Sequence, residues 1–127
     1  MADVNRGSRP LSPHLTIYRP QWTSVTSILT RITGIGLLLA SVLIVWWFLA
    51  ASYGPAYFDV ANGVITSWFG DLIMFGSLWA IWYHFLAGLR HLYWDSGRGF
   101  ELEEAKKLAY GVVGGSVVLT ILTALIV

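Results

Sequence analysis

The sequence predicts an all-α integral membrane protein with three transmembrane helices. Of its 127 residues, 56% are hydrophobic and only 12% are charged, which is about half the charged fraction of a soluble domain. Three mostly apolar stretches carry no charge when His84 is neutral, at 32–51, 72–89 and 108–127. About 20 apolar residues in a helix cross the hydrocarbon core of a bilayer, so each stretch is long enough to span it. The length allows one domain, covering 1–127.

The composition excludes several other classes of protein. The chain has no cysteine, which rules out disulfide scaffolds, cysteine-ligated zinc and iron–sulfur clusters held by this chain. A net charge of +1 is too small for a nucleic-acid-binding surface. The first apolar run starts at Ile32, later than in a cleaved signal peptide, and it is longer. A transporter or channel is disfavoured because there is no inverted repeat and only one ionisable residue within a helix.

The positions of the charges give the order and orientation of the elements. A cytoplasmic N-terminal segment (1–23) is expected before helices at about 28–51, 70–92 and 105–127. The eight Lys and Arg residues lie before or at the start of the first helix, or between the end of the second and the start of the third. The loop at about 52–70 has none. Since Lys and Arg concentrate in inner loops, the N-terminus and the second loop are expected in the cytoplasm or matrix.

The third helix is expected to begin in water and then enter the bilayer. Gly97 and Gly99 break the chain after the second helix. Acidic residues follow, and they favour a helix N-terminus. Glu103 lies four residues before Lys107, a spacing that stabilises a helix.

His84 is the polar residue that most needs an explanation. It precedes Arg90 by six residues, which places it about 9 Å from the inner end of the second helix. At that depth an ionisable residue usually faces a partner or a cofactor. A neutral imidazole is a common axial ligand of haem iron, and Gly88 on the same face would let a flat ligand approach. The alternative is a hydrogen bond to a neighbouring helix. Since only His14 and His91 remain, a bis-histidine haem site would need a histidine from another chain.

Arg31 is the second polar residue of interest. It opens the first apolar run, and Ser27 shares its face if the helix extends back that far. The arginine can reach outward to a lipid phosphate. Alternatively, its planar guanidinium can bind an anion or a carbonyl, such as a propionate or a quinone oxygen.

Two stretches of the sequence carry a more specific pattern. They read Arg9-Pro10-Leu11-Ser12-Pro13-His14-Leu15-Thr16-Ile17-Tyr18 with Ser27-Ile28 and Arg31-Ile32-Thr33-Gly34, and His84-Phe85-Leu86-Ala87-Gly88-Leu89-Arg90-His91-Leu92-Tyr93-Trp94-Asp95. Over about residues 9–110 the chain closely resembles the cytochrome b membrane-anchor subunits of succinate dehydrogenase, respiratory complex II. The second stretch is the more specific, because its fixed residues match at fixed spacing.

The resemblance implies a set of binding residues and no catalytic residue. His84 takes the position of the axial ligand to the iron of haem b. Ser27 and Arg31 take positions that line the ubiquinone pocket, with Arg31 also near the haem propionates. His91 takes a position near the haem edge, and Asp95 a polar position at the same membrane boundary.

The resemblance also implies partners. A companion hydrophobic anchor subunit would supply the second haem ligand. A flavoprotein subunit would oxidise succinate, and an iron–sulfur subunit, in contact with the stretch 12–14, would carry the electrons to the membrane. The chain itself would anchor these subunits in a bacterial inner membrane, bind haem b and ubiquinone, and help pass electrons from succinate to ubiquinone.

One departure and two alternatives accompany this expectation. The family often has histidine immediately before the arginine, where this chain has Thr30, so a contact made by that histidine does not carry over. The chain could also be the anchor of a fumarate reductase, since the same components would then carry out the reverse reaction. A third possibility is a purely structural anchor without haem.

Overall fold

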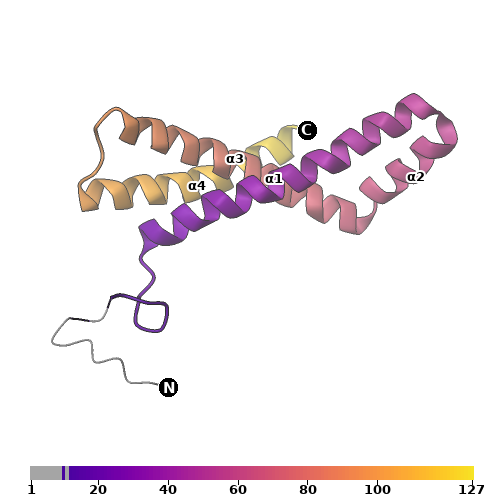
Figure 1. The fold of residues 1–127 in the computed structure, drawn as a ribbon. Helices are drawn as coiled ribbons and strands as arrows, with labels where there is room; N and C mark the ends of the chain where they lie inside the picture. The colour runs from indigo at the N-terminus through magenta and orange to yellow at the C-terminus, as the bar shows by residue number, and fades with distance from the viewer. Residues whose placement is uncertain (1–9, 11) are drawn as a thin grey trace, which may run out of the picture.

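The computed structural model describes residue 10 and residues 12–127, and all regular structure in this part of the chain is helical (Figure 1). The helices are α1 (Trp22–Tyr53), α2 (Pro55–Ile65), α3 (Trp68–Asp95) and α4 (Leu102–Ile126). Helices α1, α3 and α4 are each long and apolar enough to cross a membrane. The predicted all-α membrane protein with three spanning helices is therefore confirmed.

The spanning helices extend beyond the charge-free runs that predicted them. Helix α1 begins at Trp22 rather than near residue 28, and α3 runs on to Asp95 rather than ending near residue 92. A charge-free run marks only the part of a helix that lies in hydrocarbon. Backbone hydrogen bonding continues into the interface, where polar and aromatic side chains are tolerated. As a result, Ser27 and Arg31 both lie within α1.

Helix α2 is the element that sequence analysis missed, because the segment from about 52 to 70 was expected to be a loop. Pro55 occupies the first turn of α2 and Gly54, with φ of +131°, turns the chain before it. The indole of Trp47 donates to Asn62 Oδ1 at 3.2 Å, which fastens α2 to α1. At the other end, a Cβ at Gly70 would collide with the carbonyl oxygen of Ile65. This turn therefore requires glycine.

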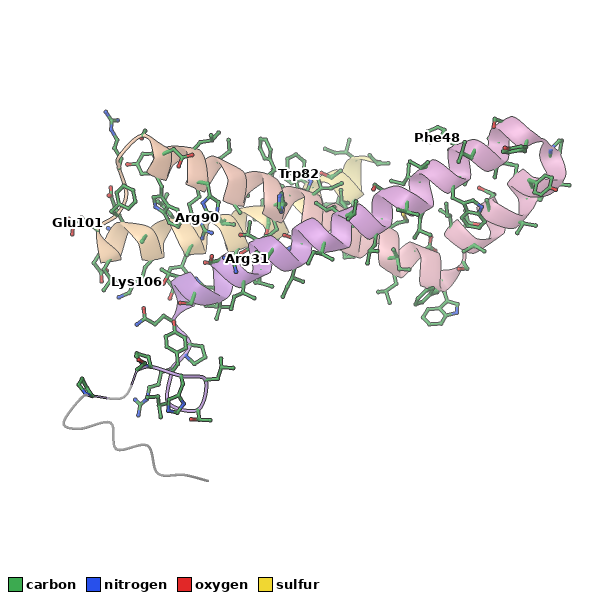
Figure 2. All side chains as sticks on the ribbon, in the orientation of Figure 1. Arg31, Phe48, Trp82, Arg90, Glu101 and Lys106 are labelled. Carbon is green, nitrogen blue, oxygen red and sulfur yellow. The ribbon has the colours of Figure 1, made fainter. Side chains whose placement is uncertain are left out.

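Helix α3 packs against both α1 and α4 (Figure 1). The connections α1–α2 and α3–α4 lie at opposite ends of the bundle in this view. The buried cluster at the centre consists of Tyr83, Ala87 and Val112. Most large apolar side chains of the three helices point outward (Figure 2), as expected where lipid or another membrane subunit is the neighbour.

Hydrogen bonds between α3 and α4 have a consistent direction. The indoles of Trp79 and Trp82 on α3 donate to Ser116 Oγ at 3.1 Å and to Thr123 Oγ1 at 3.0 Å. These two hydroxyls donate in turn to carbonyl oxygens of their own helix. Side-chain hydrogen bonds of this kind join helices in a membrane, where helix association gains little from the hydrophobic effect.

Candidate functional site

His84 lies within α3 and its imidazole is held against α1. Its Nδ1 lies 3.1 Å from the carbonyl oxygen of Thr30 and 3.3 Å from Thr33 Oγ1. A carbonyl can only accept, so the proton is on Nδ1. The unprotonated Nε2 has no hydrogen-bond partner among the described residues. The side chain is half-buried, and it thus presents one free nitrogen lone pair in the apolar part of the bundle.

Gly34 permits this close contact between the imidazole and α1. A Cβ built at position 34 would lie 3.1 Å from His84 Cε1 and 3.6 Å from Nδ1. On α3 itself, a Cβ at Gly88 would meet nothing within 4 Å. The region one turn from His84 is therefore open.

Ser27 and Arg31 lie on the same face of α1 as Gly34, because the three positions are spaced by four and three residues. Ser27 is half-buried and Arg31 is exposed. Figure 2 places Arg31 toward the end of the bundle that carries Glu101 and Lys106. This face thus leads from a hydroxyl and a guanidinium near one boundary to the imidazole of His84.

The other sequence-predicted polar residues do not join this cluster directly. His91 is exposed on α3, and its ring meets the edge of Trp94 at a centroid distance of 5.2 Å. Asp95 is exposed at the end of α3. His14 is also exposed, and its Nδ1 lies 2.6 Å from Thr16 Oγ1. The start of the first motif, at Arg9 and Leu11, lies outside the described residues.

Sequence analysis missed a second set of polar contacts beside His84. Arg90 is buried, and its Nη1 donates to Thr26 Oγ1 at 3.0 Å. Tyr83, also buried, donates from its hydroxyl to the carbonyl oxygen of Thr26 at 2.6 Å. The spacing of seven residues between Tyr83 and Arg90 is the signal that could have revealed it, since both must then face α1.

The donor set at His84 fits a haem iron. Axial ligation requires a neutral imidazole with a free nitrogen, and Nδ1 is already committed to a backbone carbonyl, the usual orienting partner of a metal-ligating histidine. His91 lies two turns away on the same helix, about 10 Å along its axis, so it cannot ligate the opposite side of an iron held by His84.

Fold and site together define a small multi-pass membrane protein whose second spanning helix presents one half-buried histidine beside the first. Comparison with known proteins identifies the class more closely. The chain belongs to the succinate dehydrogenase/fumarate reductase transmembrane subunit family, whose model matches residues 5–123. The resemblance inferred from the two motifs is confirmed.

Three relatives show how far the similarity extends. The succinate dehydrogenase cytochrome b556 subunit of Paracoccus denitrificans is 54% identical over 126 residues, which cover 99% of this chain and 97% of the relative. The cytochrome b556 subunit of Rickettsia conorii is 41% identical over 114 residues, covering 90% and 89% of the two chains. The cytochrome b560 subunit of Reclinomonas americana is 37% identical over 127 residues, covering 94% of this chain and 86% of the relative.

Proposed function

We propose that this chain is the haem b- and ubiquinone-binding membrane-anchor subunit of a succinate:quinone oxidoreductase. It anchors the flavoprotein and iron–sulfur subunits to a bacterial inner membrane, with its N-terminus in the cytoplasm. The family includes subunits of both succinate dehydrogenase and fumarate reductase, and the names of the relatives support the first function over that of a fumarate reductase anchor. The charge distribution supports the orientation, since the connection that includes α2 carries no Lys or Arg.

The observation that carries the proposal is the hydrogen bond between His84 Nδ1 and the carbonyl of Thr30. This bond fixes the tautomer and the orientation of the imidazole, and it leaves Nε2 to ligate iron. Haem b, when bound, supplies a one-electron carrier. A histidine of the companion anchor subunit would supply the second ligand, since His91 lies two turns from His84 on the same helix and His14 precedes α1. Position 30 contributes its backbone carbonyl, so threonine at this position is compatible with ligation.

Ser27 and Arg31 bind the quinone on the same face of α1. The Ser27 hydroxyl donates a hydrogen bond to one quinone oxygen. Arg31 stabilises the negative charge that develops on an oxygen during reduction, and its guanidinium would also bind a haem propionate. His91, near the haem edge, and the exposed Asp95 complete the polar boundary at this end of α3.

The haem assignment is tested by His84→Leu in the assembled complex. We expect the reduced b-type absorption of the purified complex to disappear, because leucine has no lone pair to offer the iron. Phe85→Leu, the neighbouring exposed position of α3, is the matched control and should retain the spectrum. An unchanged spectrum in His84→Leu would rule out the ligand assignment.

The quinone assignment is tested by Arg31→Gln. We expect reduction of ubiquinone by succinate to fall at least tenfold, while succinate oxidation by an artificial dye that accepts electrons upstream continues. Arg19→Gln makes the same change at an exposed position before α1 and should leave both rates unchanged. Equal loss of the two activities in Arg31→Gln, or no loss of either, would contradict the assignment.

A further inference from the structure

Three threonines form a continuous hydrogen-bonded series along the face of α1 that meets α3. Thr26, Thr30 and Thr33 are spaced by four and three residues and therefore share one face. The Thr30 hydroxyl donates to the carbonyl of Thr26 at 3.0 Å, and the Thr33 hydroxyl donates to the carbonyl of Thr30 at 3.0 Å. His84 Nδ1 bonds to that same Thr30 carbonyl at 3.1 Å. We call this set the threonine series.

Arg90 and Tyr83 hold one end of the threonine series. Both donate to Thr26, Arg90 to the hydroxyl at 3.0 Å and Tyr83 to the carbonyl at 2.6 Å. All three residues are buried, with Thr26 and Tyr83 at 0% exposure and Arg90 at 3%. Thr26 thus carries two interhelical hydrogen bonds on one residue.

Because Arg90 is buried, its guanidinium depends on the hydrogen bond to Thr26. A guanidinium stays charged in proteins, and removing a charge from water is costly unless it is well paired. Nε and Nη2 have no hydrogen-bond partner among the described residues. The remaining contact is the ring of Trp94, 4.8 Å from Cζ. The bond to Thr26 is consequently the one polar contact in this part of the chain that fixes the guanidinium.

We propose that Arg90 and Tyr83 are positioning residues for the haem ligand. By holding Thr26, they set the axial and rotational register of α1 against α3, and this register aims the Thr30 carbonyl at His84 Nδ1. A slip of one residue would move α1 by 1.5 Å and turn it by 100°, which would break the bond to His84. The role proposed for both residues acts through Thr26 and needs no contact with the haem. This inference rests on the proposed function.

The predicted effect of losing the register is a change in the haem, not only in stability. An imidazole whose Nδ1–H is hydrogen-bonded is a more basic ligand. Weakening that bond makes the imidazole a poorer donor to ferric iron, so the midpoint potential of the haem should rise. The electron paramagnetic resonance signal of the ferric haem should shift as well, because it depends on the orientation of the axial ligand.

The test uses the intact complex, four single variants and the double variant that combines the first two. Thr26→Val removes the hydroxyl that Arg90 requires, and Arg90→Gln removes the other partner. Thr26→Ser keeps a hydroxyl and is the conservative rescue. Thr123→Val is the matched control, because it removes a threonine hydroxyl that accepts one interhelical bond, from Trp82, away from His84. Each is measured by redox titration and by the ferric haem resonance signal.

We expect Thr26→Val and Arg90→Gln to raise the potential and shift the resonance signal in the same sense, and the double variant to do no more than either alone. Thr26→Ser and Thr123→Val should match the unmodified complex. If Thr26→Val fails to assemble, Tyr83→Phe provides the milder test and should produce a smaller shift in the same direction.

Three results would overturn the inference. Arg90→Gln could shift the haem while Thr26→Val does not, which would mean that Arg90 acts by its charge alone. Additive effects in the double variant would likewise show that the two residues act independently. An equal shift in Thr123→Val would show a general response to loosened packing. Failure of the proposed function is distinguishable, because the unmodified complex would then show no b-type spectrum.

Discussion

Replacing Gly34 with alanine would separate the contact with His84 from helix stability in general. In the interior of a helix this change by itself favours folding by about 1 kcal/mol. At position 34, however, the new methyl would lie 3.1 Å from His84 Cε1, whereas ordinary van der Waals contact begins at 3.4 Å. The imidazole must therefore retreat by about 0.3 Å.

That retreat acts on the hydrogen bond that orients the imidazole. The distance from Nδ1 to the Thr30 carbonyl is 3.1 Å, close to the upper end of the normal range, and a shift of about 0.3 Å takes it beyond that range. A hydrogen bond of this kind contributes about 1 kcal/mol net. The gain in helix propensity and the loss of the bond nearly cancel. We therefore expect little change in the stability of the complex but a clear change at the haem.

The assay compares haem and stability in the same preparation of the purified complex. For Gly34→Ala we expect reduced haem content or a shifted reduced b-type band, with a thermal midpoint within a few degrees of the unmodified complex. Gly114→Ala is the matched control, because it lies within α4 and its new Cβ would meet nothing within 4 Å. Haem content and spectrum identical to those of Gly114→Ala would refute the reasoning.

Three further predictions concern the packing of the helices. Gly70→Ala should destabilise the turn before α3 by more than about 2 kcal/mol, because its Cβ would meet the backbone oxygen of Ile65; normal resistance of this turn to proteolysis would contradict it. Ser116→Ala should lower the free energy of unfolding in detergent by about 1 kcal/mol, since the Trp79 indole loses its acceptor. An unchanged free energy of unfolding would mean that this hydrogen bond makes no net contribution to stability. Trp47→Phe should loosen α2 and speed its hydrogen exchange while leaving the exchange of α4 unchanged; equal acceleration in both helices would indicate global destabilisation instead.

The fold could be predicted from the sequence as far as the spanning helices are concerned. Long charge-free runs are a strong signal because the bilayer imposes a minimum length. Helix α2 is too short to give such a signal, and it is stabilised by a tertiary contact, the bond from Trp47 to Asn62. The available clue was Pro55 after Gly54, since proline favours the first turn of a helix.

The candidate site could be predicted only in part. His84 stood out because an ionisable residue within an apolar helix is conspicuous, whereas Gly34 appeared only as one position of the quoted motif. Arg90 was treated as a charge at a helix end, although it is buried five residues before the end of α3. Charge position along a sequence does not reveal which face a residue occupies. The threonines at 26, 30 and 33 carry that information through their spacing, but threonine in a membrane helix is too common to be noticed alone.

The direction of the interhelical hydrogen bonds has a consequence for how the chain is made. On α1 and α4, the hydroxyls that accept from α3 donate to carbonyls of their own helix, so each of these helices is largely self-sufficient in lipid. Helix α3 instead carries donors, including Nη1 of Arg90, whose acceptors lie on the neighbouring helices. During biosynthesis α3 emerges before α4 exists. We therefore expect α3 to be the helix that stays longest at the insertion machinery, where its polar donors are kept out of lipid until the chain is complete.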